Sequence, residues 1–190
     1  MIFKICGLKK KESVLCCEEN NADFFGMIFY KKSPRNITFN EAESLINTSK
    51  ELKIKPVGVF VDHEINDLKK IIKNLGLNNI QLHGSENQLY IDKIKNEFDV
   101  KIIKKISINN SGDLNTINKF KNIDYLLFDY KPNNNELPGG NAKSFNWNLL
   151  KDKKIKLPWF ISGGINETNI KNIQNLLNPN GIDLSSGVEV

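Results

Sequence analysis

The sequence predicts an α/β fold, a compact (β/α)8 TIM barrel that forms one domain over residues 1–190. Eight short apolar segments, rich in β-branched and aromatic residues, recur at fairly even intervals, and amphipathic helical segments separate most of them. Continuous apolar runs of this length are typical of parallel strands that are covered on both faces. Barrels of this kind usually take about 250 residues, so we expect short connections between the elements.

The expected strands follow one another from the N-terminus, at residues 2–6, 24–30, 57–61, 79–82, 101–106, 125–128, 159–162 and 182–184. Seven helices are expected between them. Two of these helices show core positions three and four residues apart, at Leu68, Ile71, Ile72 and Leu75 and at Ile170, Ile173 and Leu177. Asn40, Ser85 and Asn166 are expected to cap three of the helices. The chain ends soon after the last strand, so the expected barrel lacks its final helix.

An open doubly wound sheet also alternates strands and helices. That fold usually places a glycine fingerprint directly after its first strand, whereas Gly7 stands alone at this position. We therefore favour the closed barrel.

Composition and charge argue against several classes of protein. The net charge of +5 comes from lysines interleaved with acidic residues, which is typical of solvated helix faces, and no basic face with aromatic residues indicates a nucleic-acid partner. No apolar run approaches the roughly 18 residues of a membrane span, and the N-terminus is typical of a strand rather than a signal peptide. Cys6, Cys16 and Cys17 cannot build a disulfide framework or a zinc site. We expect a cytoplasmic protein with no metal and no membrane partner.

Two turns at consecutive strand ends indicate a phosphate site. Ser162-Gly163-Gly164 follows the seventh strand and Ser185-Ser186-Gly187 follows the eighth. Backbone N–H groups in such turns can hold a phosphate without a cationic side chain. Barrel enzymes commonly bind phosphate at these two strand ends.

Cys6 and Asp129 are the candidate base and acid, because they end the first and sixth strands, whose carboxyl ends face the mouth of a barrel. Isomerising a sugar requires one group that donates a proton and another that removes one. A free thiol has a pKa of about 8.5, so Cys6 needs nearby positive charge to ionise near neutrality. Asp129 needs the reverse, a site that raises its pKa so that it carries a proton.

Other polar residues at strand ends are candidates for binding. Arg35, after Ser33-Pro34, has the planar fork that binds a carboxylate. His63 and His83 lack a clear carboxylate partner, so we assign no metal to them. Gly139-Gly140 lies in the loop after Asp129, where it could let the loop close over a substrate.

The blocks at the strand ends resemble one known family, phosphoribosylanthranilate isomerase. In chain order they are Lys4-Ile5-Cys6-Gly7, Gly26-Met27-Ile28-Phe29-Tyr30 with Ser33-Pro34-Arg35, Val57-Gly58-Val59-Phe60-Val61, Gln81-Leu82-His83-Gly84, Phe128-Asp129, Ile161-Ser162-Gly163-Gly164-Ile165 and Asp183-Leu184-Ser185-Ser186-Gly187-Val188-Glu189. The resemblance spans the whole chain. Each block alone is weak, whereas the first and last together with Gln-Leu-His-Gly are specific.

The resemblance implies an enzyme of tryptophan biosynthesis that isomerises N-(5-phosphoribosyl)anthranilate by an Amadori rearrangement, without a cofactor. It implies that Asp129 is the general acid at the furanose ring oxygen and that Cys6 is the general base at C2′. It further implies that Arg35 meets the anthranilate carboxylate and that the two turns hold the phosphate. The remaining positions expected to bind substrate are Gln81, His83 and Asp183.

The chain departs from the family in its sixth loop. Where the family usually has Gly-Gly-Thr-Gly and then Phe-Asp-Trp, this chain has Gly139-Gly140-Asn141-Ala142 and Phe145-Asn146-Trp147. We expect this difference to alter the closure of the loop. Family members also continue past the position of Val190 into a phosphate-facing turn and a closing helix, so we expect a weaker phosphate site.

Two other functions are compatible with these residues. One is a non-catalytic barrel that binds a phosphorylated ligand, which the altered loop and the short C-terminus favour. The other is isomerisation of the related aminoaldose of histidine biosynthesis, a chemistry expected to use two aspartates, and Cys6 on the first strand argues against it. The expected partner is the phosphorylated small-molecule substrate, bound by a monomer or a homodimer.

Overall fold

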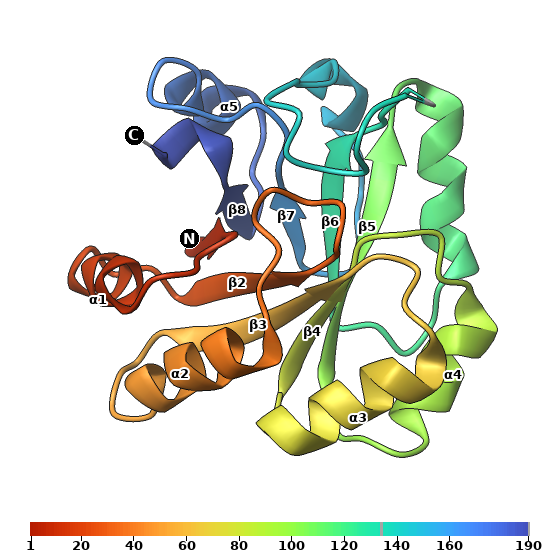
Figure 1. The fold of residues 1–190 in the computed structure, drawn as a ribbon. Helices are drawn as coiled ribbons and strands as arrows, with labels where there is room; N and C mark the ends of the chain where they lie inside the picture. Colours follow the sequence, from red (N-terminus) through yellow and green to blue (C-terminus); the bar gives the residue numbers. More distant parts are fainter. Residues whose placement is uncertain (134, 190) are drawn as a thin grey trace.

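The computed structural model describes residues 1–133 and 135–189, and its described strands form a closed barrel (Figure 1). In order they are β1 (Ile2–Cys6), β2 (Phe24–Phe29), β3 (Lys55–Phe60), β4 (Asn79–Leu82), β5 (Lys101–Ile108), β6 (Tyr125–Tyr130), β7 (Trp159–Ile161) and β8 (Gly181–Leu184). All neighbouring pairs are parallel, and β8 closes the ring by pairing with β1, Ile2 opposite Gly181. The predicted fold class is confirmed, with strand bounds within two residues of those expected.

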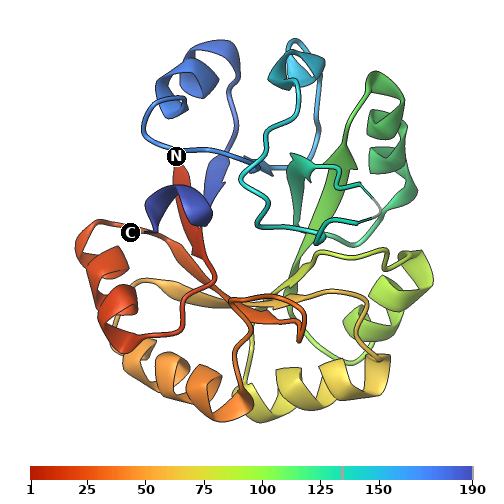
Figure 2. The same ribbon diagram turned by 45° about the horizontal axis from the view of Figure 1, so that its top comes forward.

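Helices form an outer ring around the strands (Figure 2). The α-helices in the described ranges are α1 (Lys11–Glu19), α2 (Phe39–Ser49), α3 (Ile65–Leu75), α4 (Gln88–Lys95) and α5 (Ile170–Leu176), and the 3-10 helices are η1 (Ser111–Lys119), η2 (Trp147–Leu150) and η3 (Ser186–Val188).

In the described ranges seven helices lie between successive strands, as expected, and two of them, η1 and η2, are 3-10 helices. The η1 segment is rich in Ser, Gly, Asp, Asn and Thr, and most of these side chains compete with the backbone for hydrogen bonds. Asn110 and Asp113 form a capping box at its start. After β8 the chain forms η3, and Val190 lies outside the described part of the chain.

The capping residues of three helices differ from those expected. Thr38, rather than Asn40, caps α2 and forms a capping box with Glu41. Asn87, rather than Ser85, caps α4. Asn169 directly precedes α5, while Asn166 lies four residues before the helix begins, and its side chain accepts a hydrogen bond from the Thr168 N–H. Each segment offers two or more capable side chains, and tertiary packing selects one of them.

Alternate residues of each strand face the inside of the barrel, as the two-residue period of a strand requires. The apolar layer inside consists of Cys6, Phe24, Val57, Val59, Ile103, Leu127 and Phe160. The same alternation continues toward the carboxyl ends of the strands with polar residues, Lys105 two residues after Ile103 and Asp129 two residues after Leu127. The interior is therefore apolar in the middle and polar at its mouth.

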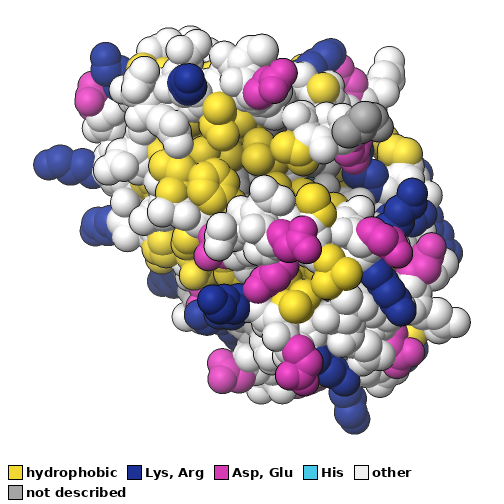
Figure 3. Space-filling model, turned by 90° about the vertical axis from the view of Figure 1, so that its left-hand side faces the viewer, with side chains coloured by type: hydrophobic (Ala, Val, Ile, Leu, Met, Phe, Trp, Pro, Cys, Tyr) yellow, Lys and Arg dark blue, Asp and Glu magenta, His cyan; other side chains and the backbone are white. Residues whose placement is uncertain are grey.

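One side of the barrel carries exposed apolar groups. Figure 3 faces the side where both termini lie and shows hydrophobic side chains gathered there. Phe3 and Ile5 of β1 and Leu184 of β8 are only partly buried, and Val188 in η3 is exposed. In the described ranges, no helix combines the length and the apolar character needed to cross a membrane.

Candidate active site

A cavity opens at the carboxyl ends of the strands, with about 890 Å³ of empty space that includes solvent at its open side. All the residues predicted for the site line it: Cys6, Arg35, Gln81, His83, Asp129, Gly163, Gly164, Asp183, Ser185, Ser186 and Gly187. The structure thus brings the predicted residues together from six strand ends, while their individual roles stay predictions. His63 does not line this cavity and packs edge-on against the Phe60 ring.

Cys6 ends β1 with its thiol buried inside the barrel. Gly26 on β2 makes room for it, because a Cβ at that position would lie 2.7 Å from Cys6 Sγ. Burial raises the pKa of the thiol to about 11, and this effect is only partly opposed by Lys4. The cavity without substrate therefore holds Cys6 as a neutral thiol, contrary to the lowered pKa expected of a base.

Beneath Cys6 lies a buried ion pair that the sequence analysis missed. Lys4 is completely buried, and its ammonium group donates to Asp183 Oδ1 at 2.8 Å. The two residues are register partners on β1 and β8. The sequence did contain a signal for this pair. Residues 4 and 6 of a strand face the same side, so Lys4 faces the barrel interior with Cys6. A lysine buried there requires an acidic partner.

The carboxylate of Asp129 lies among several hydrogen-bond donors. Its Oδ1 accepts from the Tyr130 N–H at 2.8 Å, and its Oδ2 lies 3.4 Å from His83 Nε2. Burial raises the pKa of Asp129, but the contacts with His83, the charge of Lys105 and the Tyr130 N–H together hold it below the ordinary value. The direction is opposite to the one expected of a general acid, so the carboxyl is ionised in the cavity without substrate.

The ring of His83 is neutral, with its proton on Nε2. Gln81 Nε2 lies 2.8 Å from His83 Nδ1 and donates to it, while His83 Nε2 faces two acceptors, the Pro138 carbonyl at 3.1 Å and the Asp129 carboxylate. Burial and the charge of Lys105 lower the pKa of His83 to about 4, which agrees with this tautomer. The buried Gln81 Oε1 accepts no hydrogen bond from the residues that the structure describes, and it belongs to a side chain that lines the cavity.

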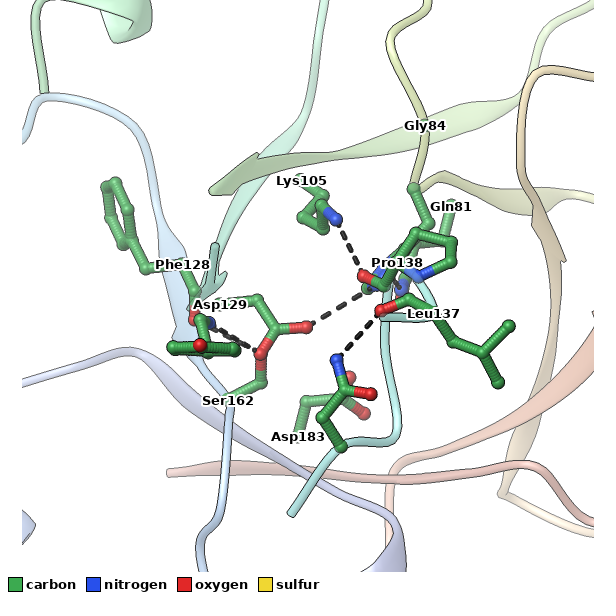
Figure 4. Close-up of polar contacts among 12 residues, drawn as sticks. Gln81, Gly84, Lys105, Phe128, Asp129, Leu137, Pro138, Ser162 and Asp183 are labelled. Atoms are coloured by element: carbon green, nitrogen blue, oxygen red, sulfur yellow. Dashed lines mark hydrogen bonds and ion pairs between the residues drawn. The ribbon is translucent and has the colours of Figure 1, made fainter. Parts of the chain in front are cut away.

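Lys105 is a second residue that the sequence analysis missed. It projects from the inner face of β5, and its ammonium group donates to the Pro138 carbonyl at 2.8 Å. Burial lowers the pKa of Lys105, which Asp129 partly opposes. Figure 4 shows the ammonium group of Lys105 and the carboxylate of Asp129 both directed toward the segment at Pro138.

The loop after β6 lies over the cavity, and residues 137–143 line it. A Cβ on Gly139 would lie 2.7 Å from His83 Nε2, so the backbone packs directly on the imidazole. Asn141, one of the departures from the family pattern, donates from Nδ2 to the Leu137 carbonyl at 2.7 Å and ties the loop together. Ala142, the other departure, adopts a left-handed conformation with φ of 52°.

Ala142→Gly is expected to stabilise the protein, because a left-handed residue with a Cβ is strained by about 1 kcal/mol or more, which exceeds the entropy that glycine adds to the unfolded chain. We expect the free energy of unfolding in urea to rise by up to about 1 kcal/mol. Ala42→Gly, inside helix α2, is the control and should destabilise the protein by about 1 kcal/mol. Equal losses at both positions would contradict the strain at Ala142.

The two turns after β7 and β8 line the cavity. Gly163 and Gly164 have φ of 88° and 63°, a left-handed region that favours glycine. No residue in the described ranges accepts a hydrogen bond from the N–H groups of Gly164, Ser186 or Gly187. These donors are available for an anion.

Arg35 reaches the cavity from the loop after β2. Its Nε and Nη2 atoms form a bidentate pair with Glu189, with Nη2 2.6 Å from Glu189 Oε2. This contact uses one edge of the guanidinium group and leaves Nη1 near Gly140, whose Cβ would lie 2.9 Å from it. The remaining edge can therefore bind a second carboxylate in the cavity. Among the described residues, no three His, Cys, Asp or Glu side chains gather in a geometry that would hold a metal ion.

Comparison with known proteins finds relatives that match nearly the whole chain. Residues 3–190 match the family described as N-(5'phosphoribosyl)anthranilate (PRA) isomerase. The N-(5'-phosphoribosyl)anthranilate isomerase of Zymomonas mobilis is 39% identical over 188 residues, 98% of this chain and 88% of the relative, and that of Paramagnetospirillum magneticum is 34% identical over 188 residues, 98% and 87%.

Solved structures agree with these relatives. Phosphoribosyl anthranilate isomerase from Thermotoga maritima has a TM-score of 0.86 at 30% identity and covers 100% of this chain and 90% of its own. A phosphoribosyl anthranilate isomerase in complex with reduced 1-(o-carboxyphenylamino)-1-deoxyribulose 5-phosphate has a TM-score of 0.82 at 29% identity, with coverage of 100% and 90%.

Proposed function

The chain belongs to the N-(5'-phosphoribosyl)anthranilate isomerase family, and on this premise we propose that Cys6 and Asp129 are the general base and general acid of the reaction. The reaction converts N-(5-phosphoribosyl)anthranilate into 1-(2-carboxyphenylamino)-1-deoxyribulose 5-phosphate in tryptophan biosynthesis. The observation that carries the proposal is one cavity lined by a thiol from β1, a carboxyl group from β6 and the turns after β7 and β8.

The chemistry divides into two proton transfers. Asp129 donates a proton to the furanose ring oxygen, the bond between this oxygen and C1′ breaks, and an iminium group forms between C1′ and the anthranilate nitrogen. Cys6 then removes the proton from C2′, and the electron pair of that bond neutralises the iminium group to give an enolamine. The enolamine tautomerises to the amino ketone, so the reaction consumes and releases nothing.

Substrate binding raises the pKa of Asp129, so that the carboxyl group can carry the proton it donates. The cavity without substrate holds the proton on Cys6 and leaves Asp129 ionised, since the two pKa values are raised and lowered respectively. A phosphate and a carboxylate bring negative charge into the site, which raises the pKa of a nearby carboxyl group. The same negative charge opposes ionisation of Cys6, so the thiol depends on a neighbouring cation.

Each part of the substrate has a complementary group in the cavity. The N–H groups of Gly164, Ser186 and Gly187, which donate to no described residue, suit the phosphate. The open edge of Arg35 suits the anthranilate carboxylate. Gln81 Oε1, which has no hydrogen-bond donor among the described residues, suits a ribose hydroxyl group that would satisfy this buried acceptor. His83 and Asp183, which line the same cavity, complete the proposed binding site.

The direct test is turnover of freshly generated phosphoribosylanthranilate, followed by the loss of its fluorescence. We expect steady conversion to the amino ketone by the wild-type chain at catalytic concentrations. A chain that binds the compound without converting it would be the non-catalytic phosphate-binding barrel. That result would contradict the proposed roles of Cys6 and Asp129.

Arg35→Lys is expected to raise KM about tenfold with a much smaller effect on kcat, because an ammonium group cannot form the bidentate contact with a carboxylate. The contact is made equally in the bound substrate and the transition state, so it affects binding rather than the chemical step. Steady-state kinetics measure both constants. Lys32→Met, at an exposed position of the same loop, is the control and should leave both unchanged. A fall in kcat at constant KM would place Arg35 in the chemical step instead.

A further inference from the structure

Cys6 requires a cation close to its sulfur, because burial and the anionic substrate both oppose the thiolate. Lys4 is two residues away on the same strand and faces the same interior. A Cβ on Gly26 would lie 2.7 Å from Cys6 Sγ and 3.2 Å from Lys4 Nζ, so the thiol and the ammonium group flank a single point on β2. The two groups are neighbours inside the barrel.

The ammonium group of Lys4 is held in this position. It is completely buried and cannot turn to solvent, and it donates to Asp183 at 2.8 Å across the β1–β8 pairing. Asp183 prevents a lone charge from lying in the barrel interior, which would otherwise favour the neutral amine. The pair therefore keeps Lys4 protonated beside the thiol.

We propose that Lys4 is a positioning residue for Cys6: its ammonium group, fixed by Asp183, stabilises the thiolate through which Cys6 acts as the base. This inference rests on the proposed function of Cys6 and adds the group that makes the function possible. The isomerase reaction itself involves no chemical change at Lys4.

The other charged groups around Cys6 do not replace Lys4. Asp183 on β8 opposes the thiolate, and its effect on the pKa of Cys6 is smaller than that of Lys4. Arg35, from the loop after β2, favours the thiolate less than Lys4 does and is itself paired with Glu189. Asp129 and His83 line the cavity from β6 and the end of β4, and His83 is neutral.

The test measures the thiolate directly, without substrate. In a chain carrying Cys16→Ser and Cys17→Ser, the rate at which Cys6 reacts with iodoacetamide below its pKa is proportional to the thiolate fraction. Lys4→Met is expected to lower this rate about tenfold, since an opposite charge at this range shifts a pKa by about one unit or more. Asp183→Asn is expected to lower the rate as well, because the buried ammonium group loses the partner that holds it, in its charged form, beside the thiol. Lys4→Arg should restore most of the rate.

Lys105→Met is the matched control, because it also removes a buried ammonium group from the inner face but one that bonds to the Pro138 carbonyl instead. Its alkylation rate should match the wild type. If either single variant fails to fold, the double variant Lys4→Met with Asp183→Asn leaves no unpaired charge and should still react more slowly than wild type. A rate in Lys4→Met that equals or exceeds the wild-type rate would overturn the inference.

The experiment separates this inference from the proposed function. If Cys6 is not the base, Cys6→Ser retains activity while the alkylation rates still depend on Lys4. If Cys6 is the base but Lys4 has no effect on it, Cys6→Ser loses activity while Lys4→Met keeps the wild-type alkylation rate.

Discussion

Cys6→Ser is expected to lower kcat/KM for phosphoribosylanthranilate by about 100-fold or more, the range for removal of a general base. A hydroxyl group is far less acidic than a thiol and cannot supply an anion inside the barrel at neutral pH. Although the pKa of Cys6 is raised to about 11, kcat/KM of the wild type should stay nearly constant from neutrality toward that value, because the gain in thiolate is offset by the loss of the proton that Asp129 must donate.

Cys16→Ser and Cys17→Ser are the matched controls for this variant. Both residues lie on helix α1, away from the cavity, and neither belongs to the proposed machinery. Each should keep the wild-type rate constant and pH profile. Near-normal turnover by Cys6→Ser would remove the thiol from the mechanism and reopen the search for a base among the other groups of the cavity.

Asp129→Asn is expected to lower kcat by about 10² to 10⁴-fold, because an amide cannot donate the proton that opens the furanose ring. The substitution preserves the size of the side chain and can keep the hydrogen bond from the Tyr130 N–H. Binding of a stable product analogue should therefore change far less than kcat. Single-turnover fluorescence measurements and equilibrium binding report the two quantities separately.

Asp152→Asn serves as the control for this loss. Asp152 is exposed and has a left-handed φ of 59°, which asparagine tolerates, so activity and stability should both be retained. If Asp129→Asn lost binding of the analogue to the same extent as turnover, Asp129 would be a binding group rather than the acid.

The strands and their order follow from local patterns, which explains why they are predictable. An apolar run such as residues 101–106 carries its own signal for a buried parallel strand, and eight runs alternating with helices restrict the topology to few choices. The segments that form η1 and η2 were harder to predict, because their polar residues support several local conformations of similar energy. The capping residues observed lie two or three positions from those predicted for the same reason.

The candidate site was predictable as a set, because the carboxyl ends of all strands in a barrel meet at one mouth. Cys6, Asp129 and the two glycine and serine turns needed only their places at the strand ends and their resemblance to one family. Lys4 and Lys105 escaped notice because lysine is usually a surface residue, and only the closed ring turns their strand positions inward.

The sequence by itself determined the barrel, its strand order and the residues around its mouth, since these depend on periodicity and on the type of residue at each strand end. Only the tertiary structure decided the charges within the site. It pairs Lys4 with Asp183, which are 179 positions apart in the chain. It also places the Pro138 carbonyl within hydrogen-bonding distance of His83 and Lys105. The pKa of a buried group depends on its neighbours in space and on its distance from water, and the amino-acid sequence alone gives neither of them.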